Sequence, residues 1–326
     1  MLAYLKSMTA VAAALVALPG SSMAQGSYPD RPITIVVSSA VGGSIDGLAR
    51  QLAPYWEKAL GGKINVENHE GAGGVVGVRY FLEQPDDGYT ILICTEAHYT
   101  ATVEKTGTVK TSDIELINMQ QFTPTTWYVL EGSRFKTLED PIKEGKEKPD
   151  TISWGAPPTG NSTISAGVVE KGWGVDLRYI PQETGAATDT ALLGGHIDVK
   201  VGTAGDITEV EGIRGLAVAA KERVAFQPDV PTFNEVGSKM GLMAMPDIGT
   251  GRLISVRAGV KANHPEIFQK LADSYKAAFN DPAYQEVLKS SGQANSSAFN
   301  EPDAATAQFR QLVDDAIKFK KEYAVQ

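Results

Sequence analysis

Cysteine is almost absent from this chain, because Cys94 is the only one among 326 residues. An intramolecular disulfide is therefore excluded, whatever the redox state of the compartment. Cys94 ends the apolar stretch 90–94, which is typical of a strand, so we interpret it as a small buried hydrophobic residue. A nucleophilic role would require a nearby base, for which His98 is the only candidate.

Long apolar runs are also missing. After the first two dozen residues, no uninterrupted apolar stretch is long enough to span a membrane. Those first residues resemble an export signal, since Lys6 precedes an Ala/Val/Leu-rich core and Ser22-Met23-Ala24 fits a small-x-small cleavage site. We predict a signal peptide over residues 1–24, cleaved near Ala24, and a periplasmic mature chain. The alternative is a buried N-terminal helix.

Positive charge is scarce. The chain has 30 Lys and Arg against 39 Asp and Glu, a net charge of −9, and losing Lys6 would leave −10 (29 basic against 39 acidic residues). Such a surface disfavours nucleic acid and anionic membranes, and it would not attract an anionic solute from a distance. Any anion site must therefore act locally, through N–H groups and hydroxyls inside a cleft.

Recognisable catalytic and metal motifs are lacking as well. The four histidines (His69, His98, His196 and His264) show no spacing typical of metal ligands, and Ser44 lacks the flanks of a nucleophile elbow. We expect no metal, no cofactor and no enzymatic activity.

The glycines from Gly71 to Gly77 allow two interpretations. They lie between a strand and a helix, and Glu96 follows the next strand, as in a dinucleotide-binding fold. However, the spacing is G-x-G-x-x-x-G and the preceding strand is short and polar. We therefore favour a tight turn packed against a sheet.

A binding loop is predicted near the start of the mature chain. Residues 33–37 form an apolar β-branched run, Gly42-Gly43 allows a turn, and an amphipathic helix follows from Ser44 to Gly61. A glycine-bearing loop that opens a helix offers unpaired N–H groups and a positive dipole end to an anion. Asp46 either interacts favourably with that dipole as an acidic residue of the first turn or reaches into the cleft as a hydrogen-bond acceptor for a ligand.

A second loop of the same kind follows about a hundred residues later. Residues 151–154 are typical of a strand, and the loop 155–163 ends in good helix-capping residues, namely Thr159, Gly160, Asn161, Ser162 and Thr163. The chain alternates strands and helices and is too long for one compact core, which predicts an α/β protein of two lobes. One loop in each lobe would clamp a ligand from both sides.

Several motifs in order resemble the Bug, or tripartite tricarboxylate transporter (TTT), family of periplasmic solute-binding proteins. They are the opening from Tyr28 to Val37, Gly42-Gly43-x-x-Asp46, Val66-Glu67-Asn68 with Gly71–Gly74, Pro85-Asp86-x-Gly88-Tyr89-Thr90, residues 192–198, Leu216-Ala217-Val218, and Pro228-Asp229-Val230-Pro231-Thr232-Phe233-x-Glu235-x-Gly237. The resemblance covers nearly the whole mature chain.

This resemblance implies a two-lobed type II periplasmic-binding-protein fold, in which each lobe is a mostly parallel sheet flanked by helices and the ligand cleft lies between the lobes. Residues 25–121 and 248–326 would form lobe 1, and residues 122–247 would form lobe 2.

The resemblance also implies ligand-binding residues. One carboxylate would be held by Gly42, Gly43, Ser44 and Asp46 together with the loop from Thr159 to Thr163. Thr95, His98, Gln182 and Thr203 would touch the distal part of the ligand.

The chain departs from the family at four places in the site. In the second-lobe loop, Pro157-Pro158-Thr159-Gly160-Asn161-Ser162-Thr163 replaces a segment like Ser-Ser-Gly-x-Gly-Ser. Ser38-Ser39-Ala40-Val41 replaces a Pro-Phe-like segment, so Ser39 is a candidate for ligand choice. Gln182 replaces a tyrosine, and residues 247–252 replace a Trp-Tyr-Gly-like return. Arg252 is either a solvated surface residue or a bidentate partner for a second carboxylate.

The expected function is capture of a small organic acid for a transporter with integral membrane subunits, with no nucleic-acid partner and with a monomeric protein. The alternatives are a ligand-presenting sensor and an exported α/β enzyme that uses Glu96 and the Gly71 turn.

Overall fold

The structure is a computed structural model that describes residues 28–158, 161–203 and 211–323. The predicted signal peptide, Thr159 and Gly160 lie outside the described residues. Within the described part of the chain, no helix combines the length and apolar character needed to cross a bilayer.

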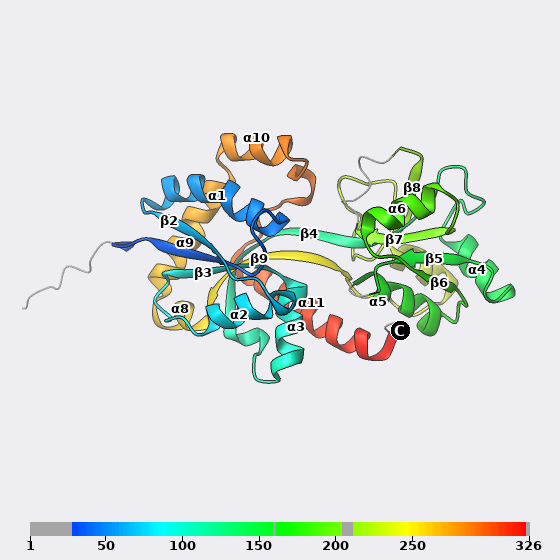
Figure 1. Cartoon of the computed structure of the whole chain (residues 1–326), viewed down its shortest axis with the longest axis horizontal. Coiled ribbons are helices and arrows are strands. Elements are labelled where there is room, and N and C mark those ends of the chain that lie inside the picture. Colours follow the sequence, from blue (N-terminus) through cyan, green and yellow to red (C-terminus); the bar gives the residue numbers. More distant parts are fainter. Residues whose placement is uncertain (1–27, 159–160, 204–210, 324–326) are drawn as a thin grey trace, which may run out of the picture.

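Two lobes are joined by two long strands, as Figure 1 shows. Strand β4 (Ile114–Leu130) pairs in its first part with β9 (Gly249–Arg257), antiparallel from Ile114↔Arg257 to Pro124↔Gly249. In its second part β4 pairs with strands of the other lobe, beginning at Thr125↔Thr203. A single strand therefore belongs to both sheets and fixes their relative direction.

The sheet of the first lobe has a parallel part and an antiparallel part. Its order is β2 (Ile64–Asn68), β1 (Ile33–Val37), β3 (Thr90–Thr95), β9 and β4. The strands β2, β1 and β3 are parallel, and β9 is antiparallel to β3 and to β4. Strands β1 and β3 are buried on both faces, which is why they read as continuous β-branched or apolar runs.

Helices cover both faces of this sheet. One face packs against α1 (Ser44–Leu60), α9 (Pro265–Phe279) and α10 (Pro282–Ser290), near α8 (Ala258–Asn263). The other face packs against α2 (Val75–Leu82), α3 (Glu96–Thr106) and α11 (Pro302–Tyr323). Short 3-10 turns lie at Ala72–Gly74 (η1), Thr111–Asp113 (η2) and Ala294–Ser296 (η6).

Helix α1 forms where the apolar spacing predicts it. Its buried residues include Leu48, Leu52 and Trp56, and the helix ends at Gly61, whose φ of 77° is the left-handed conformation that glycine adopts without strain. Trp56 Nε1 donates to Ser274 Oγ of α9 at 2.9 Å, so the largest buried side chain of α1 also has its polar atom paired.

The sheet of the second lobe is built around the end of β4. Strand β4 is antiparallel to β8 (Ile213–Val218) and to β7 (Val199–Thr203), and β7, β5 (Ser153–Ala156) and β6 (Arg178–Pro181) are parallel. Its helices are α4 (Glu139–Glu147), α5 (Asn161–Gly167), the π-helical turn η3 (Val168–Gly172), α6 (Gly185–Leu193) and α7 (Phe233–Gly237), followed by η5 (Ser238–Met240).

The α/β alternation predicted from the sequence is confirmed, and the parallel strands lie in two sheets as expected. The antiparallel strand β9 and the first part of β4 were not predicted, because β9 begins with a glycine-containing segment and residues 118–126 of β4 are mostly polar. Both sheets are consequently mixed.

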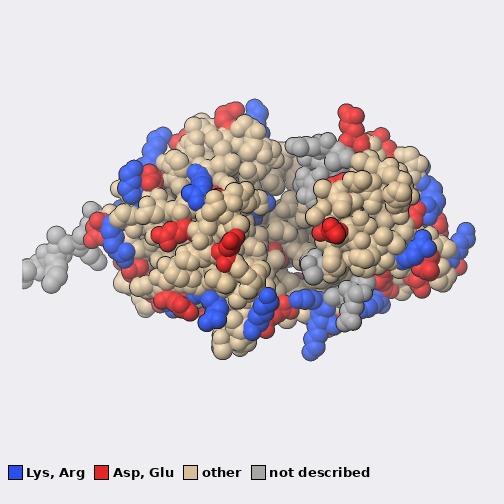
Figure 2. All heavy atoms as spheres, in the orientation of Figure 1, with Lys and Arg blue, Asp and Glu red and all other residues tan. Residues whose placement is uncertain are grey.

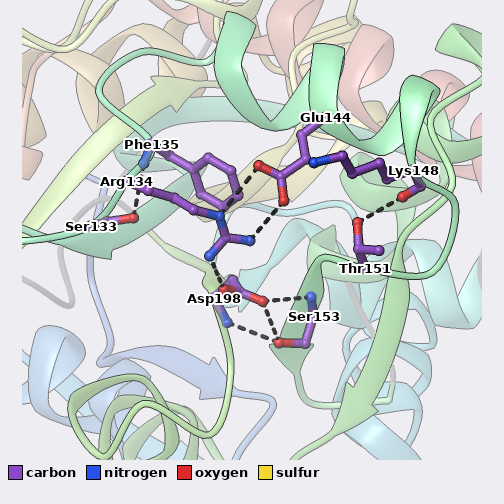
Figure 3. A network of polar contacts seen from close by, with 8 residues as sticks. All are labelled: Ser133, Arg134, Phe135, Glu144, Lys148, Thr151, Ser153 and Asp198. Atoms are coloured by element: carbon purple, nitrogen blue, oxygen red, sulfur yellow. Dashed lines mark hydrogen bonds and ion pairs between the residues drawn. The ribbon is translucent and has the colours of Figure 1, made fainter.

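A polar network at the far end of the second lobe holds α4 to the sheet (Figure 3). Arg134 lies between Glu144 of α4, at 3.1 Å, and Asp198, at 2.6 Å. Asp198 also accepts hydrogen bonds from the N–H and the hydroxyl of Ser153, at 2.9 and 2.8 Å. Burial alone would raise the pKa of Asp198, but the bonds from Ser153 and Arg134 hold it below its ordinary value.

Replacing Asp198 by Asn should therefore destabilise the protein by about 1–2 kcal/mol at pH 7, because charge-assisted hydrogen bonds are lost. A carboxyl whose pKa is lowered on folding stabilises the folded protein at pH values above its ordinary pKa. That stabilisation is lost as the pH falls through the lowered pKa. The difference from the unmodified protein should thus shrink below about pH 4, measured by urea unfolding. Asp229→Asn, an exposed control in the same lobe, should show neither effect.

Candidate ligand-binding cleft

The strand directions place the carboxyl ends of both parallel sheets around one cleft. Because β9 is antiparallel to both β3 and β4, strands β1 and β3 run in the direction of β4, toward the second lobe. Because β7 is antiparallel to β4, strands β5, β6 and β7 run back toward the first lobe. The loops that follow these strands therefore face one another, as ligand loops do in open α/β sheets.

Register along β4 gives the length of strand that joins the two lobes. Thr95 pairs with Arg252, and Arg252 pairs with Gln121, so these three residues are level at the first-lobe edge. Thr203 pairs with Thr125 at the second-lobe edge. The strand rises by four residue steps from Gln121 to Thr125, which corresponds to about 13 Å.

Two residues of the segment that crosses between the lobes were missed by sequence reasoning. Phe122 and Thr123 are partly exposed between the buried Gln121 and Pro124. Thr123 Oγ1 donates to Thr250 O at 3.3 Å. The sequence predicts a strand only from Trp127 to Leu130 and gives no indication that residues 121–126 cross between the lobes.

The first-lobe loop is held in shape by Asp46. Its Oδ2 accepts the N–H of Gly42 at 2.8 Å, and its Oδ1 accepts Arg50 Nε at 2.9 Å. Gly42 has a φ of 81°, a conformation that favours glycine. Burial opposes ionisation, but Arg50 and Gly42 hold the pKa of Asp46 below its ordinary value. Of the two interpretations of Asp46, the structure supports a local one, in which the carboxylate fixes the loop.

These contacts also identify the donors at this loop. The N–H of Gly42 is engaged by Asp46 and that of Gly43 by Ala40 O at 3.2 Å. The N–H groups that a helix leaves without intrahelical partners are those of its first turn, which starts at Ser44. Donation by Gly42 itself, expected from the sequence, would require a change in this loop.

Ser39 and Val41 complete the first-lobe loop. Ser39 Oγ is buried and makes no hydrogen bond within the described residues, whereas Ser39 O accepts Asn68 Nδ2 at 3.0 Å. A buried hydroxyl without a partner indicates a position that another polar group can fill. Val41 is 73% exposed, an unusual position for an apolar side chain.

His98 is positioned by three neighbouring segments. Its Nδ1 lies 2.8 Å from Ser38 Oγ, its backbone N–H donates to Thr95 Oγ1 at 3.1 Å, and its ring packs on Gly74, where a Cβ atom would lie 2.2 Å away. Burial lowers the pKa of His98, so the imidazole is neutral at pH 7. Thr95 is the N-cap of α3 and lies beside it.

The Gly71–Gly77 segment is confirmed as a tight turn. Gly71, Gly73 and Gly74 have positive φ, and a Cβ atom on Gly77 would lie 2.7 Å from Ser38 Cα. Glu96, which a dinucleotide site would use for ribose, is buried and bonded to Asn161 instead. Cys94 is buried as predicted, and burial raises the pKa of its thiol.

The second-lobe residues lie on the opposite side of the cleft. Asn161 begins α5, and its Nδ2 donates to Gly249 O at 2.6 Å and to Glu96 Oε1 at 3.3 Å. Ser162 and Thr163 follow in the first turn, and Thr163 is buried. Nothing is described for Thr159 and Gly160.

Gln182 and Thr203 lie at the ends of their strands. Gln182 N donates to Ala156 O at 3.0 Å, and Thr203 O accepts the hydroxyl of Tyr128 at 3.1 Å. Thr184 caps α6, which starts at the same edge, by accepting the N–H of Ala187. Both strand-end residues are therefore at the edge that faces the first lobe.

Arg252 is partly buried, and its Nη1 donates to Gln121 Oε1. It is thus not a solvated surface arginine. The residues that the sequence assigns to the two binding loops include no Lys or Arg. Figure 2 shows that the first-lobe side of the hollow between the lobes is bordered mostly by residues other than Lys, Arg, Asp and Glu. Within the described ranges, no group of three or more His, Cys, Asp and Glu could hold a metal ion.

Relatives of known family support this description. The family model described as "Tripartite tricarboxylate transporter family receptor" matches residues 48–323. A UPF0065 protein of Cupriavidus necator is 30% identical over 281 residues, which cover 84% of this chain and 82% of that protein. Protein BugT of Bordetella pertussis is 26% identical over 235 residues, 70% of this chain and 71% of that protein.

Solved structures share the fold. A TctC solute-binding protein from Polaromonas has a TM-score of 0.79 at 24% identity, covering 90% of this chain and 99% of that one. The periplasmic binding protein BugD has a TM-score of 0.62 at 27% identity, covering 90% and 98%. Two proteins of Rhodopseudomonas palustris, solved with adipate and with malate, have TM-scores of 0.65 and 0.61 at 20% and 21% identity, covering 90% of this chain and 97% and 99% of theirs.

The fold is that of two-lobed periplasmic solute-binding proteins. More specifically, the chain belongs to the tripartite tricarboxylate transporter receptor family, as the resemblance of its motifs indicated.

Replacing Asp46 by Ala should free the N–H of Gly42 and remove the carboxylate that pairs with Arg50, which keeps its bond to Asn68. We expect a loss of about 1–2 kcal/mol in the free energy of unfolding and faster amide hydrogen exchange at residues 40–46. Asp314→Ala, an exposed control on α11 of the same lobe, should change neither quantity. Unchanged exchange at Gly42 in the Asp46 variant would contradict the role given to this carboxylate.

Proposed function

We propose that the protein is an extracytoplasmic solute-binding protein that captures a small organic acid in the cleft and delivers it to the integral membrane subunits of a tripartite tricarboxylate-type transporter. It works in the periplasm as a monomer, without a cofactor and without chemistry on the ligand. Lobe 1 comprises residues 25–121 and 248–326, lobe 2 comprises residues 122–247, and the signal peptide ends near Ala24.

The observation that carries this proposal is the convergence of helix starts on one cleft. Helices α1, α3 and α6 all follow the carboxyl ends of strands whose directions point into it. Each start contributes N–H groups without intrahelical partners, of which Thr95 and Thr184 each cap one in α3 and α6, and the positive end of a helix dipole. An anion can therefore bind although the protein carries a net charge of −9.

The residues around these starts give the ligand contacts. Ser44 and the orphan hydroxyl of Ser39 donate to one carboxylate from the first lobe, in a loop shaped by Gly42, Gly43 and Asp46. From the second lobe the donors are the residues at and before the start of α5, which are Thr159, Gly160, Asn161, Ser162 and Thr163. Thr95, His98, Gln182, Thr203 and Arg252 contact the distal part of the ligand.

The ligand class is supported by two structural neighbours, one solved with adipate and one with malate. Both are small dicarboxylates. Binding would shift an equilibrium between open and closed arrangements of the lobes, since the helix starts of both lobes must approach the same ligand.

A thermal-shift screen tests the carboxylate proposal. The chain from residue 25 onward is mixed with mono-, di- and tricarboxylates and with aromatic acids, and the matching uncharged amides serve as ligand controls. A hundredfold excess over the dissociation constant should stabilise the protein by about 2.7 kcal/mol. Melting shifts with cationic or neutral solutes, and none with any carboxylate, would refute the proposal.

Arg252 is expected to recognise a second carboxylate. Arg252→Ala should weaken binding of a dicarboxylate by about tenfold to a hundredfold, the range expected for losing a charge-assisted pair, while the affinity for the matching monocarboxylate stays the same. Isothermal calorimetry measures both. Arg178→Ala, an exposed arginine at the far end of β6, is the matched control. An unchanged dicarboxylate affinity in the Arg252 variant would exclude this role.

A further inference from the structure

One buried carboxyl connects the two lobes beside the cleft. Glu96, the first residue of α3, is 2% exposed. Its Oε1 accepts Asn161 Nδ2 of the second lobe at 3.3 Å, and its Oε2 accepts the N–H of Gly251 on β9 at 3.2 Å. The carboxyl therefore bridges the start of α5, the start of α3 and a strand of the first-lobe sheet.

The Asn161 amide makes this bridge directional. Its two N–H donors go to different acceptors, one to Glu96 Oε1 and one to Gly249 O at 2.6 Å. An amide held at both donors cannot rotate without losing a hydrogen bond in a buried place, which is costly. The position of α5 relative to β9 and α3 thus depends on Glu96.

The surroundings of Glu96 are short of compensating positive charge. A small cavity lies beside it, with walls from both lobes and from α11, and two further carboxyls line it, Asp247 and Asp315. Lys221 Nζ lies 3.6 Å from Asp247 Oδ2 and is the cation facing this group. Within the described residues, no Lys or Arg forms a salt bridge with Glu96.

Burial raises the pKa of two of these acids, Glu96 and Asp247. Desolvation raises the pKa of Glu96 to about 7, although the N–H groups of Asn161, Gly251 and Ala97 oppose the rise. Desolvation also raises the pKa of Asp247, against the attraction of Lys221. Separating the lobes here would hydrate Glu96 and return its pKa toward the ordinary value of about 4.3.

The sign follows from linkage. A carboxyl whose pKa is raised in the joined arrangement favours that arrangement fully at low pH, where it is protonated in both states. This free-energy advantage decreases as the pH rises from about 4.3 to about 7. Above that range, the relative free energy of the two arrangements no longer changes with pH.

We propose that Glu96 is a positioning residue: it holds the start of α5 against the first lobe, and its ionisation loosens this contact, so that ligand capture weakens as the pH rises. This inference rests on the proposed function, because it concerns the second-lobe half of the same carboxylate site. It predicts a binding protein that captures its acid more tightly in a mildly acidic medium than in an alkaline one.

Glu96→Gln is the decisive variant, because the amide has nearly the same shape and does not ionise. The probe is the carboxylate that gives the largest melting shift in the screen, and calorimetry measures its dissociation constant at pH 6, 7 and 8, where simple carboxylates stay ionised. The unmodified protein should bind up to about tenfold more weakly at pH 8 than at pH 6. Glu96→Gln should change by less than about twofold, since no proton is linked to its contact.

Two further variants make the result specific. Glu170→Gln removes another carboxyl whose pKa is raised by burial. Glu170 Oε1 accepts Trp154 Nε1 within the second lobe at 2.8 Å, so it makes no contact between the lobes through this bond. This variant should show the same change of dissociation constant with pH as the unmodified protein. Asn161→Asp places a second carboxylate against Glu96 and should steepen the loss of affinity with pH. A flat profile in the unmodified protein, an unchanged slope in Glu96→Gln, or an equal loss of slope in Glu170→Gln would overturn the proposal.

A measurement without ligand separates this inference from the proposed function. Between pH 5 and 8, the melting temperature of the ligand-free unmodified protein should fall relative to that of Glu96→Gln, because only the former carries the linked proton. If no carboxylate binds, the proposed function fails, and this comparison still tests whether ionisation of Glu96 destabilises the folded protein. Parallel melting profiles would refute it.

Discussion

The antiparallel pairing of β4 with β9 is the constraint on which the rest of the structure depends. Because β4 continues from this pairing into the second sheet, its direction sets the direction of every other strand in both lobes. The parallel strands of the two lobes must then point toward each other, and the loops after them must meet. A site built from helix starts in both lobes is the geometric consequence, and it needs no cluster of cationic side chains.

The same two strands bring buried acids to the junction of the lobes. Each sheet covers its faces with helices, so polar groups are expected where the cores end, and Glu96, Asp247 and Asn161 all lie there. Asp46 and Glu96 show how environment separates two similar carboxyls. Asp46 has an arginine and a backbone N–H and stays ionised, whereas Glu96 has only neutral donors and a lowered tendency to ionise. The first fixes a loop, and the second makes a contact between lobes sensitive to protons.

Much of the fold could be predicted from the sequence, since strands such as Ile33–Val37 and helices such as Ser44–Leu60 carry strong local patterns. The start of β9 could not, because Gly249-Thr250-Gly251-Arg252 has no apolar alternation and is a strand only through its neighbours β3 and β4. For the candidate site, the glycine loop and the residues at strand ends could be identified. The partial exposure of Phe122 and Thr123 could not, because it depends on where a long strand leaves one core and enters another.

The sequence by itself determined the alternation of elements, the family, and the requirement that an anion be bound without attractive net charge, since these follow from local periodicity, ordered motifs and composition. Only the tertiary structure decided what individual polar groups do. Asp46 turned out to bind the N–H of Gly42, and Glu96 turned out to bind Asn161 of the other lobe, 65 residues away along the chain. The physical reason is that burial and hydrogen-bond partners come from segments far apart in sequence, and these control the pKa and the role of a carboxyl.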